Sequence, residues 1–262
     1  MGTSGAYGGS PGWNKVRDQT KEWLNSGGGG GDGDGSPPPV PPTPPPETPE
    51  ERPTIPRPTI TPTLARVITG LGALLAGGGG GGGRGGPSGG EGRSTGRAAR
   101  VGGRALGGAY GARTGTAGAL AELGLDLGEL SGLSKYQQAK RILDAAIGPR
   151  GDVLDSELRK TNAEVVLWAL SEEIEPTPVE MANRWVVEYV WQVWLTESGP
   201  TLQEHSGAGY DRLRAEQEMR VALEALVSAR GLPDDRPLTG ADFTAAIDGA
   251  LASLRRISGT AA

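Results

Sequence analysis

Residues 153–194 read VLDSELRKTNAEVVLWALSEEIEPTPVEMANRWVVEYVWQVW and contain two helical patterns separated by a turn at Pro176. Asp152 or Asp155 begins the first helix, and Thr177 and Pro178 provide the N-cap and first turn of the second. Four of the six tryptophans lie in this stretch, and we expect them to form the core where the two helices meet. The apolar positions at helical spacing are Leu154, Leu158, Val165, Trp168 and Leu170, then Met181, Trp185, Val186, Tyr189, Trp191, Val193 and Trp194.

Three further helices are predicted around this pair. Ser134 caps one that ends at Ile147, another runs from about Tyr210 to Arg230, and the last begins after Thr239. No stretch shows the apolar and polar alternation of a strand. The sequence therefore predicts an all-α fold, a helical bundle over residues 93–262 with a first helix at 93–122 and about five after it.

Residues 93–118 are rich in glycine and arginine and contain no acidic residue. On a helix, glycines spaced by four would form a groove for close helix packing, but each interior glycine destabilises a helix by up to about 1 kcal/mol. The segment is therefore either a helix held by a packing partner or a continuation of a disordered tail. The glycines that would form the groove are Gly103, Gly107, Gly111 and Gly115.

The arginines of this segment resemble an RNA-binding tract, but only Tyr110 lies among them to stack on a base. From Ala119 onward the chain has 14 Lys and Arg against 23 Asp and Glu, a net charge of −9. We expect no direct binding of nucleic acid, because this charge repels phosphate. The adjacent acidic residues Glu172, Glu173 and Glu175 are expected on a solvated helix face.

Low hydrophobicity marks the first third of the chain. The protein has 46 Gly and 21 Pro, with 35% hydrophobic residues, and 13 of the prolines lie between Pro37 and Pro62. This composition predicts a disordered linker over residues 26–92 that acts as a spacer. Its apolar stretch, Leu64 to Ala76, is shorter than the roughly 20 residues of a membrane span. With no secretory signal at the start, we expect a cytoplasmic protein without membrane contact.

Residues 11–25, PGWNKVRDQTKEWLN, form a short amphipathic pattern with both tryptophans on one face. Together with the first ten residues they make up a predicted N-terminal unit at 1–25. Two interpretations remain open: Trp13 and Trp23 dock onto a partner protein, or they fold back onto the chain's own helical domain.

No catalytic pattern is present in the sequence. The chain has no cysteine and a single histidine, His205, so no His/Cys metal cluster can form. The glycine runs lack the Gly-Lys-Ser/Thr of a phosphate-binding loop, and no G-x-S-x-G motif occurs. We therefore expect no catalytic residue, no metal, no cofactor and no enzymatic activity.

The chain begins MGTSGAYGG, which places a glycine directly after the initiator methionine. Removal of the methionine would leave Gly2 with the free α-amine, whose pKa of about 8 lies well below the value of about 10.4 for lysine. More of this amine is therefore an uncharged nucleophile at neutral pH, with no side chain to block an approaching enzyme. The terminus is typical of a segment presented to a partner, although chains also begin Met-Gly by chance.

MGTSGAYGGS and the segment GRALGGAYGARTGTAGALAELGLDLGELSGLSKYQQAKRILDAAI resemble the QatB family of the Qat anti-phage defence system. The resemblance covers the first ten residues and about 97–230, and the linker is similar in character only. The segment PGWNKVRDQTKEWL departs from the Pro-Pro-Trp segment of other members.

This resemblance implies a non-catalytic partner of an ATPase, a QueC-like enzyme and a TatD-like nuclease. QueC enzymes activate a 7-deazaguanine carboxylate as an adenylate, and our hypothesis is that Gly2 supplies the attacking amine. The linker would let the terminus reach the enzyme while the helical domain stays docked. The alternative is a structural adaptor that bridges the ATPase and the QueC-like enzyme. The residues expected to enter or approach the enzyme's narrow site are Thr3, Ser4, Gly5, Gly8 and Gly9.

Overall fold

The computed structural model describes residues 11–26, 60–76, 90–148, 153–205, 212–233 and 236–256. Within these ranges the chain forms helices and turns without any strand, so the fold class is all-α, as the sequence predicts. The helices are α1 (Pro11–Asn25), α2 (Pro62–Ala76), α3 (Gly90–Thr114), α4 (Ala117–Ala121), α5 (Leu127–Ser131), α6 (Lys135–Ile147), α7 (Val153–Ser171), α8 (Pro178–His205), α9 (Arg212–Leu226) and α10 (Gly240–Arg256).

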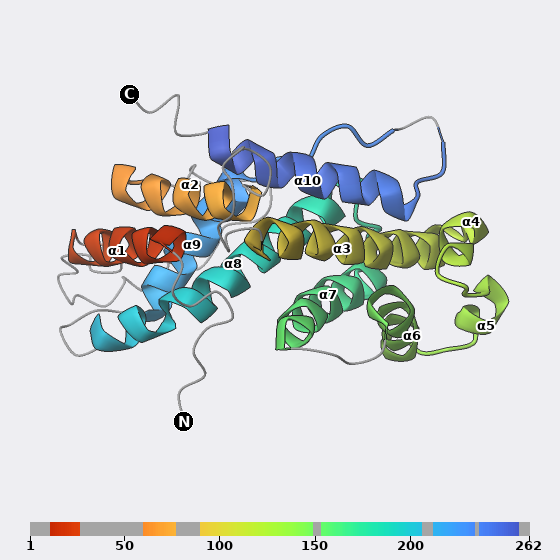
Figure 1. Ribbon diagram of the computed structural model, residues 1–262. Helices are drawn as coiled ribbons and strands as arrows, with labels where there is room; N and C mark the ends of the chain where they lie inside the picture. The colour runs from red at the N-terminus through yellow and green to blue at the C-terminus, as the bar shows by residue number, and fades with distance from the viewer. Residues whose placement is uncertain are drawn as a thin grey trace, which may run out of the picture.

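Helix α3 lies at the centre of the fold. Figure 1 shows it crossing the middle of the molecule, with α10 on one side and α6 and α7 on the other. Helix α8 also contacts α3, and α1 and α2 pack side by side at one end of the molecule. Most of the other helices are therefore positioned by the surface of α3.

Glycines on α3 bring α10 into direct contact with its backbone. A Cβ at Gly103 would lie 2.1 Å from the Thr244 hydroxyl oxygen and 2.6 Å from the Gly240 carbonyl oxygen. A Cβ at Gly107 would lie 2.9 Å from the Gly240 nitrogen. Any side chain at either position would therefore push the start of α10 away.

The next two glycines of the repeat shape the end of α3. A Cβ at Gly111 would lie 2.9 Å from the Thr116 carbonyl oxygen, so this glycine lets the chain fold back over the helix. Gly115 has a φ of 72°, a left-handed conformation that favours glycine, and it terminates α3. The prediction of one helix over 93–122 is thus wrong, because the chain reverses here and starts the separate helix α4.

Gly102 and Gly108 lie outside the four-residue repeat but also allow close packing against α3. The spacing of the glycines in the sequence did not predict this role. A Cβ at Gly102 would lie 2.4 Å from the Trp185 ring of α8. A Cβ at Gly108 would lie 2.5 Å from Leu123 and 2.8 Å from Ile142 of α6. Glycines on α3 therefore face α4, α6, α8 and α10.

Helix α2 corrects the predicted linker. Residues 62–76 lie inside the 26–92 range and form a helix whose apolar side chains are buried against α1 and α10. Its leucine, valine and isoleucine side chains recur at helical spacing, which is the signal that the linker prediction overlooked. Helix α1 also belongs to this core, so residues 11–25 are part of the helical body, whereas residues 1–10 of the predicted N-terminal unit lie outside the described residues. The buried residues of α2 are Leu64, Val67, Ile68, Leu71 and Leu75.

The later helices begin and end close to the predicted residues. Ser134 caps α6 in a capping box with Gln137, as its position predicts. The Thr177 side chain accepts a hydrogen bond from the Glu180 backbone nitrogen at 3.2 Å and so caps α8. The start of α9 at Arg212 and of α10 at Gly240 also lie close to prediction.

The tryptophans of α7 and α8 divide into two groups. Trp185 and Trp194 are fully buried, and the Trp185 indole donates a hydrogen bond to the Asn162 side-chain oxygen at 2.9 Å. Trp168 and Trp191 are only partly buried, and each has an arginine over its ring. The expected core between α7 and α8 is therefore confirmed for Trp185, whereas Trp194 packs against Trp23 of α1. Trp168 and Trp191 pack against the core but are only partly buried.

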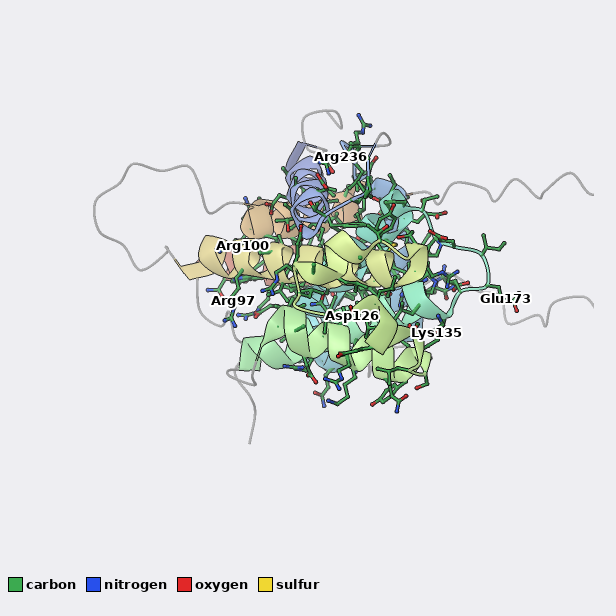
Figure 2. All side chains as sticks on the ribbon, turned by 90° about the vertical axis from the view of Figure 1, so that its right-hand side faces the viewer. Arg97, Arg100, Asp126, Lys135, Glu173 and Arg236 are labelled. Carbon is green, nitrogen blue, oxygen red and sulfur yellow. The ribbon has the colours of Figure 1, made fainter. Side chains whose placement is uncertain are left out.

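Charged side chains are unevenly placed on the surface. Figure 2 shows Arg97 and Arg100 of α3 on one side of the view and Glu173 at the opposite edge. Glu173 belongs to the turn between α7 and α8, which projects from the helical body. The α7–α8 turn is thus an acidic edge of the molecule.

The α3–α10 packing predicts opposite effects for two Gly→Ala changes in one helix. Gly103→Ala should lower the free energy of unfolding by about 1–3 kcal/mol, because its Cβ overlaps the α10 backbone. Gly96→Ala is the matched control, since a Cβ there meets nothing within 4 Å. It should raise stability by up to about 1 kcal/mol through helix propensity. Urea unfolding measures both, and equal effects would contradict the packing role.

Candidate functional site

The N-terminal residues singled out from the sequence precede the first helix. Gly2, Thr3, Ser4, Gly5, Gly8 and Gly9 lie outside the described residues. The structure does describe the helix that follows them, and this helix determines where they leave the body.

Both tryptophans of α1 are buried in the chain's own core. Trp13 and Trp23 are each 1% exposed, and the Trp23 ring lies 6.2 Å from the ring of Trp194, measured between centroids. Of the two interpretations, folding back onto the chain's own domain is therefore correct. Docking of these rings onto a partner is wrong, because neither ring has a surface to offer.

Polar contacts fix the position of α1 along α8. The Arg17 guanidinium forms an ion pair with the buried Glu197 carboxylate, and its Nε donates to the Glu197 carbonyl at 3.2 Å. The buried Thr20 hydroxyl accepts a hydrogen bond from the Trp194 indole at 3.4 Å and lies 3.4 Å from the Ser198 hydroxyl. Because each contact has directional geometry, α1 is held in one register and one rotation. We call this set of contacts the α1 anchor.

The end of α1 and the start of α2 are adjacent. The Ser26 and Thr63 hydroxyl oxygens lie 3.3 Å apart, and Arg66 forms an ion pair with Glu22 at 2.9 Å. The two ends of the segment 27–59 are therefore adjacent. Because α1 is attached to α8, the reach of the N-terminus depends on the residues before α1 rather than on the predicted linker at 26–92.

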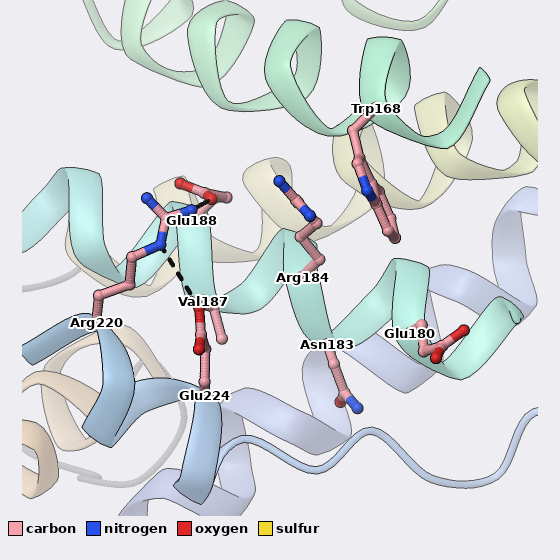
Figure 3. A pocket seen from close by; sticks show the side chains of 8 residues that line it. All are labelled: Trp168, Glu180, Asn183, Arg184, Val187, Glu188, Arg220 and Glu224. Carbon is pink, nitrogen blue, oxygen red and sulfur yellow. Dashed lines mark hydrogen bonds and ion pairs between the residues drawn. The ribbon is translucent and has the colours of Figure 1, made fainter. Parts of the chain in front are cut away.

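A pocket of about 340 Å³ opens between α7, α8 and α9. Figure 3 shows Arg184 between Glu188 and Trp168, with Arg220 beyond Glu188. These four side chains line the pocket. The other lining residues are Glu180, Asn183, Val187 and Glu224.

Glu188 is the buried charge of this pocket. It is 3% exposed, and its carboxylate forms an ion pair with Arg220 through one oxygen. The second oxygen, Oε2, is buried without a hydrogen-bond partner. Burial raises the pKa of Glu188 above its ordinary value, and Arg220 opposes this shift. The pocket thus contains an acceptor whose hydrogen-bonding capacity is unused.

The other polar groups of the pocket have partners. The Arg184 guanidinium lies 4.3 Å from the centre of the Trp168 ring. Glu180 accepts a hydrogen bond from the Thr177 backbone nitrogen at 2.7 Å. Asn183 accepts one from the Ala229 backbone nitrogen at 2.6 Å. Glu188 is therefore the member of the pocket best able to accept a further donor.

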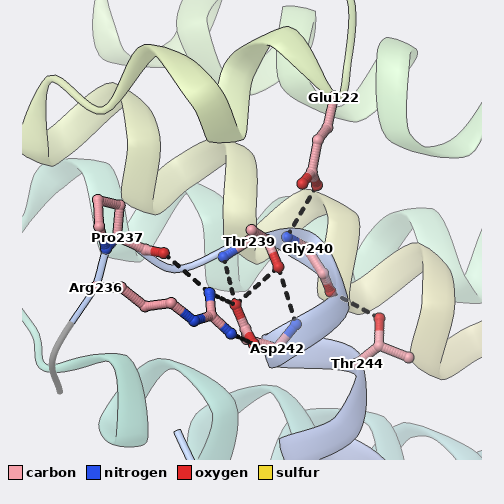
Figure 4. Close-up of polar contacts among 7 residues, drawn as sticks. All are labelled: Glu122, Arg236, Pro237, Thr239, Gly240, Asp242 and Thr244. Carbon is pink, nitrogen blue, oxygen red and sulfur yellow. Dashed lines mark hydrogen bonds and ion pairs between the residues drawn. The ribbon is translucent and has the colours of Figure 1, made fainter. Parts of the chain in front are cut away.

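The start of α10 is a second polar cluster, shown in Figure 4. Asp242 accepts hydrogen bonds from Arg236 and from the Thr239 backbone nitrogen, and Glu122 accepts one from the Gly240 nitrogen at 3.1 Å. The Arg236 hydrogen bond is the main cause that lowers the pKa of Asp242 to about 2. Because these groups satisfy one another and cap the helix, the cluster stabilises the fold and offers nothing to a ligand.

In the part of the chain that the structure describes, no three His, Asp or Glu side chains are grouped so that they could hold a metal ion. No helix within those ranges has the length and apolar content needed to cross a bilayer.

The sequence analysis did not predict this pocket. The segment from Thr161 to Asn183, which has five glutamates and no lysine or arginine, could have indicated an acidic surface nearby. The apolar spacing of α8 does not predict that Glu188 is buried, because its burial depends on how α9 packs against α8.

Comparison of the chain with protein-family models, with curated proteins and with solved structures finds no match.

The buried ion pair predicts a strong and pH-dependent effect of Arg220→Met. Loss of Arg220 should cost about 3–5 kcal/mol of stability at pH 8, because Glu188 is left buried and unpaired. Without Arg220 the folded-state pKa of Glu188 rises further, so the folded chain binds a proton that the unfolded chain releases. The loss relative to wild type should therefore be smaller at pH 5 than at pH 8. Urea unfolding at both values tests this.

The matched control is the double variant Glu188→Gln, Arg220→Met, in which the buried charge is absent. It should be more stable than Arg220→Met alone at pH 8, and the pH dependence of the difference should disappear. A double variant less stable than the single one would contradict the account.

The capping cluster predicts an acid transition centred on Asp242. Its folded-state pKa of about 2 lies below the unfolded value of 3.8, so its stabilisation is complete above about pH 5 and is lost progressively as the pH falls through the folded-state pKa toward about pH 1. Asp242→Asn should cost about 1–2 kcal/mol at pH 7. The difference from wild type should shrink below pH 4 in thermal unfolding. A difference that stays constant down to pH 2 would show that the carboxylate charge is irrelevant.

Proposed function

We propose that this chain is a non-catalytic component of a bacterial antiviral defence complex that presents its N-terminal glycine to a QueC-like partner enzyme. Gly2 is the acceptor of a 7-deazaguanine amide. The ATPase and the TatD-like nuclease of the same system are the further partners. This proposal rests on the resemblance of the N-terminus and of the Gly-rich segment to the QatB family.

The observation that supports presentation is the α1 anchor. Trp13, Trp23 and the Arg17–Glu197 pair hold α1 against the helical body, and the first ten residues directly precede α1 in the sequence. A terminus that starts at a fixed point of a folded body is offered to a partner in a defined place. The entropic cost of capturing it is lower than for the end of a long free chain.

The length of the segment sets the geometry of the complex. Residues 2–10 span at most about 30 Å when fully extended. The active site of the enzyme must therefore lie within that distance of Pro11, with the helical body docked against the enzyme itself. Gly8 and Gly9 come shortly before Pro11 in the sequence, and in this proposal they let the chain pass closely between the two proteins.

The chemistry follows from the α-amine. The enzyme uses ATP to convert the carboxylate of the deazaguanine into an acyl adenylate and releases pyrophosphate. The neutral Gly2 amine attacks the acyl carbon, the carbon–nitrogen bond forms, and AMP leaves while the amine loses its proton to a base. The product mass is that of the chain without Met1 plus the deazaguanine carboxylic acid less one water.

The proposal predicts a defined mass change at Gly2. The protein co-expressed with the QueC-like enzyme should carry the added mass on its N-terminal peptide, by intact-mass and fragment mass spectrometry. Gly2→Pro, which replaces the primary amine with a hindered secondary one, should lack it. A wild-type terminus with a plain amine, or a proline variant with the added mass, contradicts the proposal.

Deletion of residues 2–10 separates this function from that of a structural adaptor. The deletion leaves the α1 anchor intact, so the helical body should still bind its partners. A modification acceptor then loses defence against phage, whereas an adaptor keeps it. Thermal unfolding of the deletion variant serves as the control, since its midpoint should equal that of the full chain.

A further inference from the structure

The turn between α7 and α8 carries a concentration of unpaired negative charge. Residues 161–183 contain five glutamates and no lysine or arginine. Glu172, Glu173 and Glu175 are exposed on the turn, and none of them forms an ion pair with another described residue. The side chain of Glu173 points away from the helices at the edge of the molecule (Figure 2).

Apolar side chains are exposed among these carboxylates. Ile174 is 86% exposed and Val179 is 40% exposed, and only two other large hydrophobic residues in the described ranges are exposed to this degree. Ile174 stands between Glu173 and Glu175, so the turn presents an aliphatic side chain inside a negative field. A single exposed apolar residue is common on protein surfaces, so Ile174 supports a binding surface only together with the adjacent carboxylates and the pocket.

The pocket adjoins this turn. Trp168 precedes the turn on α7 and Glu180 follows it on α8, and both line the pocket. Inside it lies Glu188, nine-tenths buried and with an oxygen that has no partner. Figure 3 shows the Glu188 carboxylate and Arg184 extending to the same side of α8, toward α7. We call the exposed turn residues and the pocket together the acidic corner.

We propose that the acidic corner binds a basic segment of another protein, with one arginine or lysine side chain entering the pocket to reach Glu188. An aliphatic residue of the same segment packs on Ile174, and its remaining cations face the glutamates of the turn. This binding surface is separate from the N-terminal segment and does not depend on the proposed modification.

The charges of the pocket favour a cation over an anion. Arg220 is occupied by Glu188 and by Glu224, whose carboxylate lies 3.6 Å from its Nε. Arg184 is held on the Trp168 ring. The buried acceptor of the pocket without a partner is Glu188 Oε2, and a guanidinium or ammonium group supplies the donor that it lacks. The surrounding glutamates repel phosphate, which argues against nucleic acid and anionic lipid.

The test uses the full chain and two synthetic peptides. One alternates arginine and leucine with glycine spacers, and the other has glutamate in place of each arginine. Isothermal titration should show binding of the arginine peptide, weakened by added salt, and none of the glutamate peptide. Equal binding of the two, or no binding of the arginine peptide at low salt, overturns the proposal.

Two variants localise the binding. Glu188→Gln should weaken it about tenfold, because a charged hydrogen bond is lost. Ile174→Ser, at an exposed position that cannot unfold the protein, should weaken it about threefold through lost apolar contact. The control Glu204→Gln removes the same charge on the same helix, about 24 Å away at 1.5 Å per residue. Equal effects of all three variants would show only general attraction to an acidic protein and would overturn the proposal.

A small probe tests entry into the pocket directly. Butylguanidinium carries the head group and part of the stem of arginine. In the ¹⁵N-labelled full chain, it should shift the indole resonance of Trp168, assigned through Trp168→Phe, and leave the buried Trp185 indole unchanged. A Trp168 resonance that does not move at millimolar probe contradicts entry into the pocket.

Discussion

The fold depends on the glycines of α3, because they leave room for other helices to pack directly against the backbone of this helix. Helix α3 has glycine wherever another backbone or a large ring comes close, at Gly102 for Trp185 and at Gly103 and Gly107 for the start of α10. Such a helix is weak in isolation, since glycine is a poor helix former. It forms because its neighbours bury it, and they can pack only because it has so little bulk. Helix and surroundings are therefore stable together or not at all.

How far the sequence predicts this structure depends on whether a signal is local. The capping box at Ser134 and the start of α8 at Thr177 involve residues three positions apart, and both were predictable. Helix α2 was predictable in principle from its apolar spacing, but its surroundings of glycine and proline concealed it. Trp23 is buried beside Trp194 of α8, more than 150 residues away in the chain, and no local pattern contains that information.

The candidate site shows the same limit. The five glutamates of residues 161–183 are visible in the sequence, but a row of carboxylates on a helix is usually a solvated face. What distinguishes the acidic corner is the buried Glu188 beside it, and that burial arises where α9 crosses α8. Burying a charge without a complete set of hydrogen-bond partners costs free energy. Only the tertiary structure shows that Glu188 is such a charge.

The adjacency of Ser26 and Thr63 has a topological consequence. Since the two ends of the segment 27–59 are adjacent, the intervening residues can be lengthened without moving either helix. The entropic cost of such lengthening is small, about 0.6 kcal/mol for each doubling of a loop. A whole foreign domain whose own ends lie close together could therefore be spliced in here. This position is a natural place to insert a fluorescent reporter while both termini of the chain remain untouched.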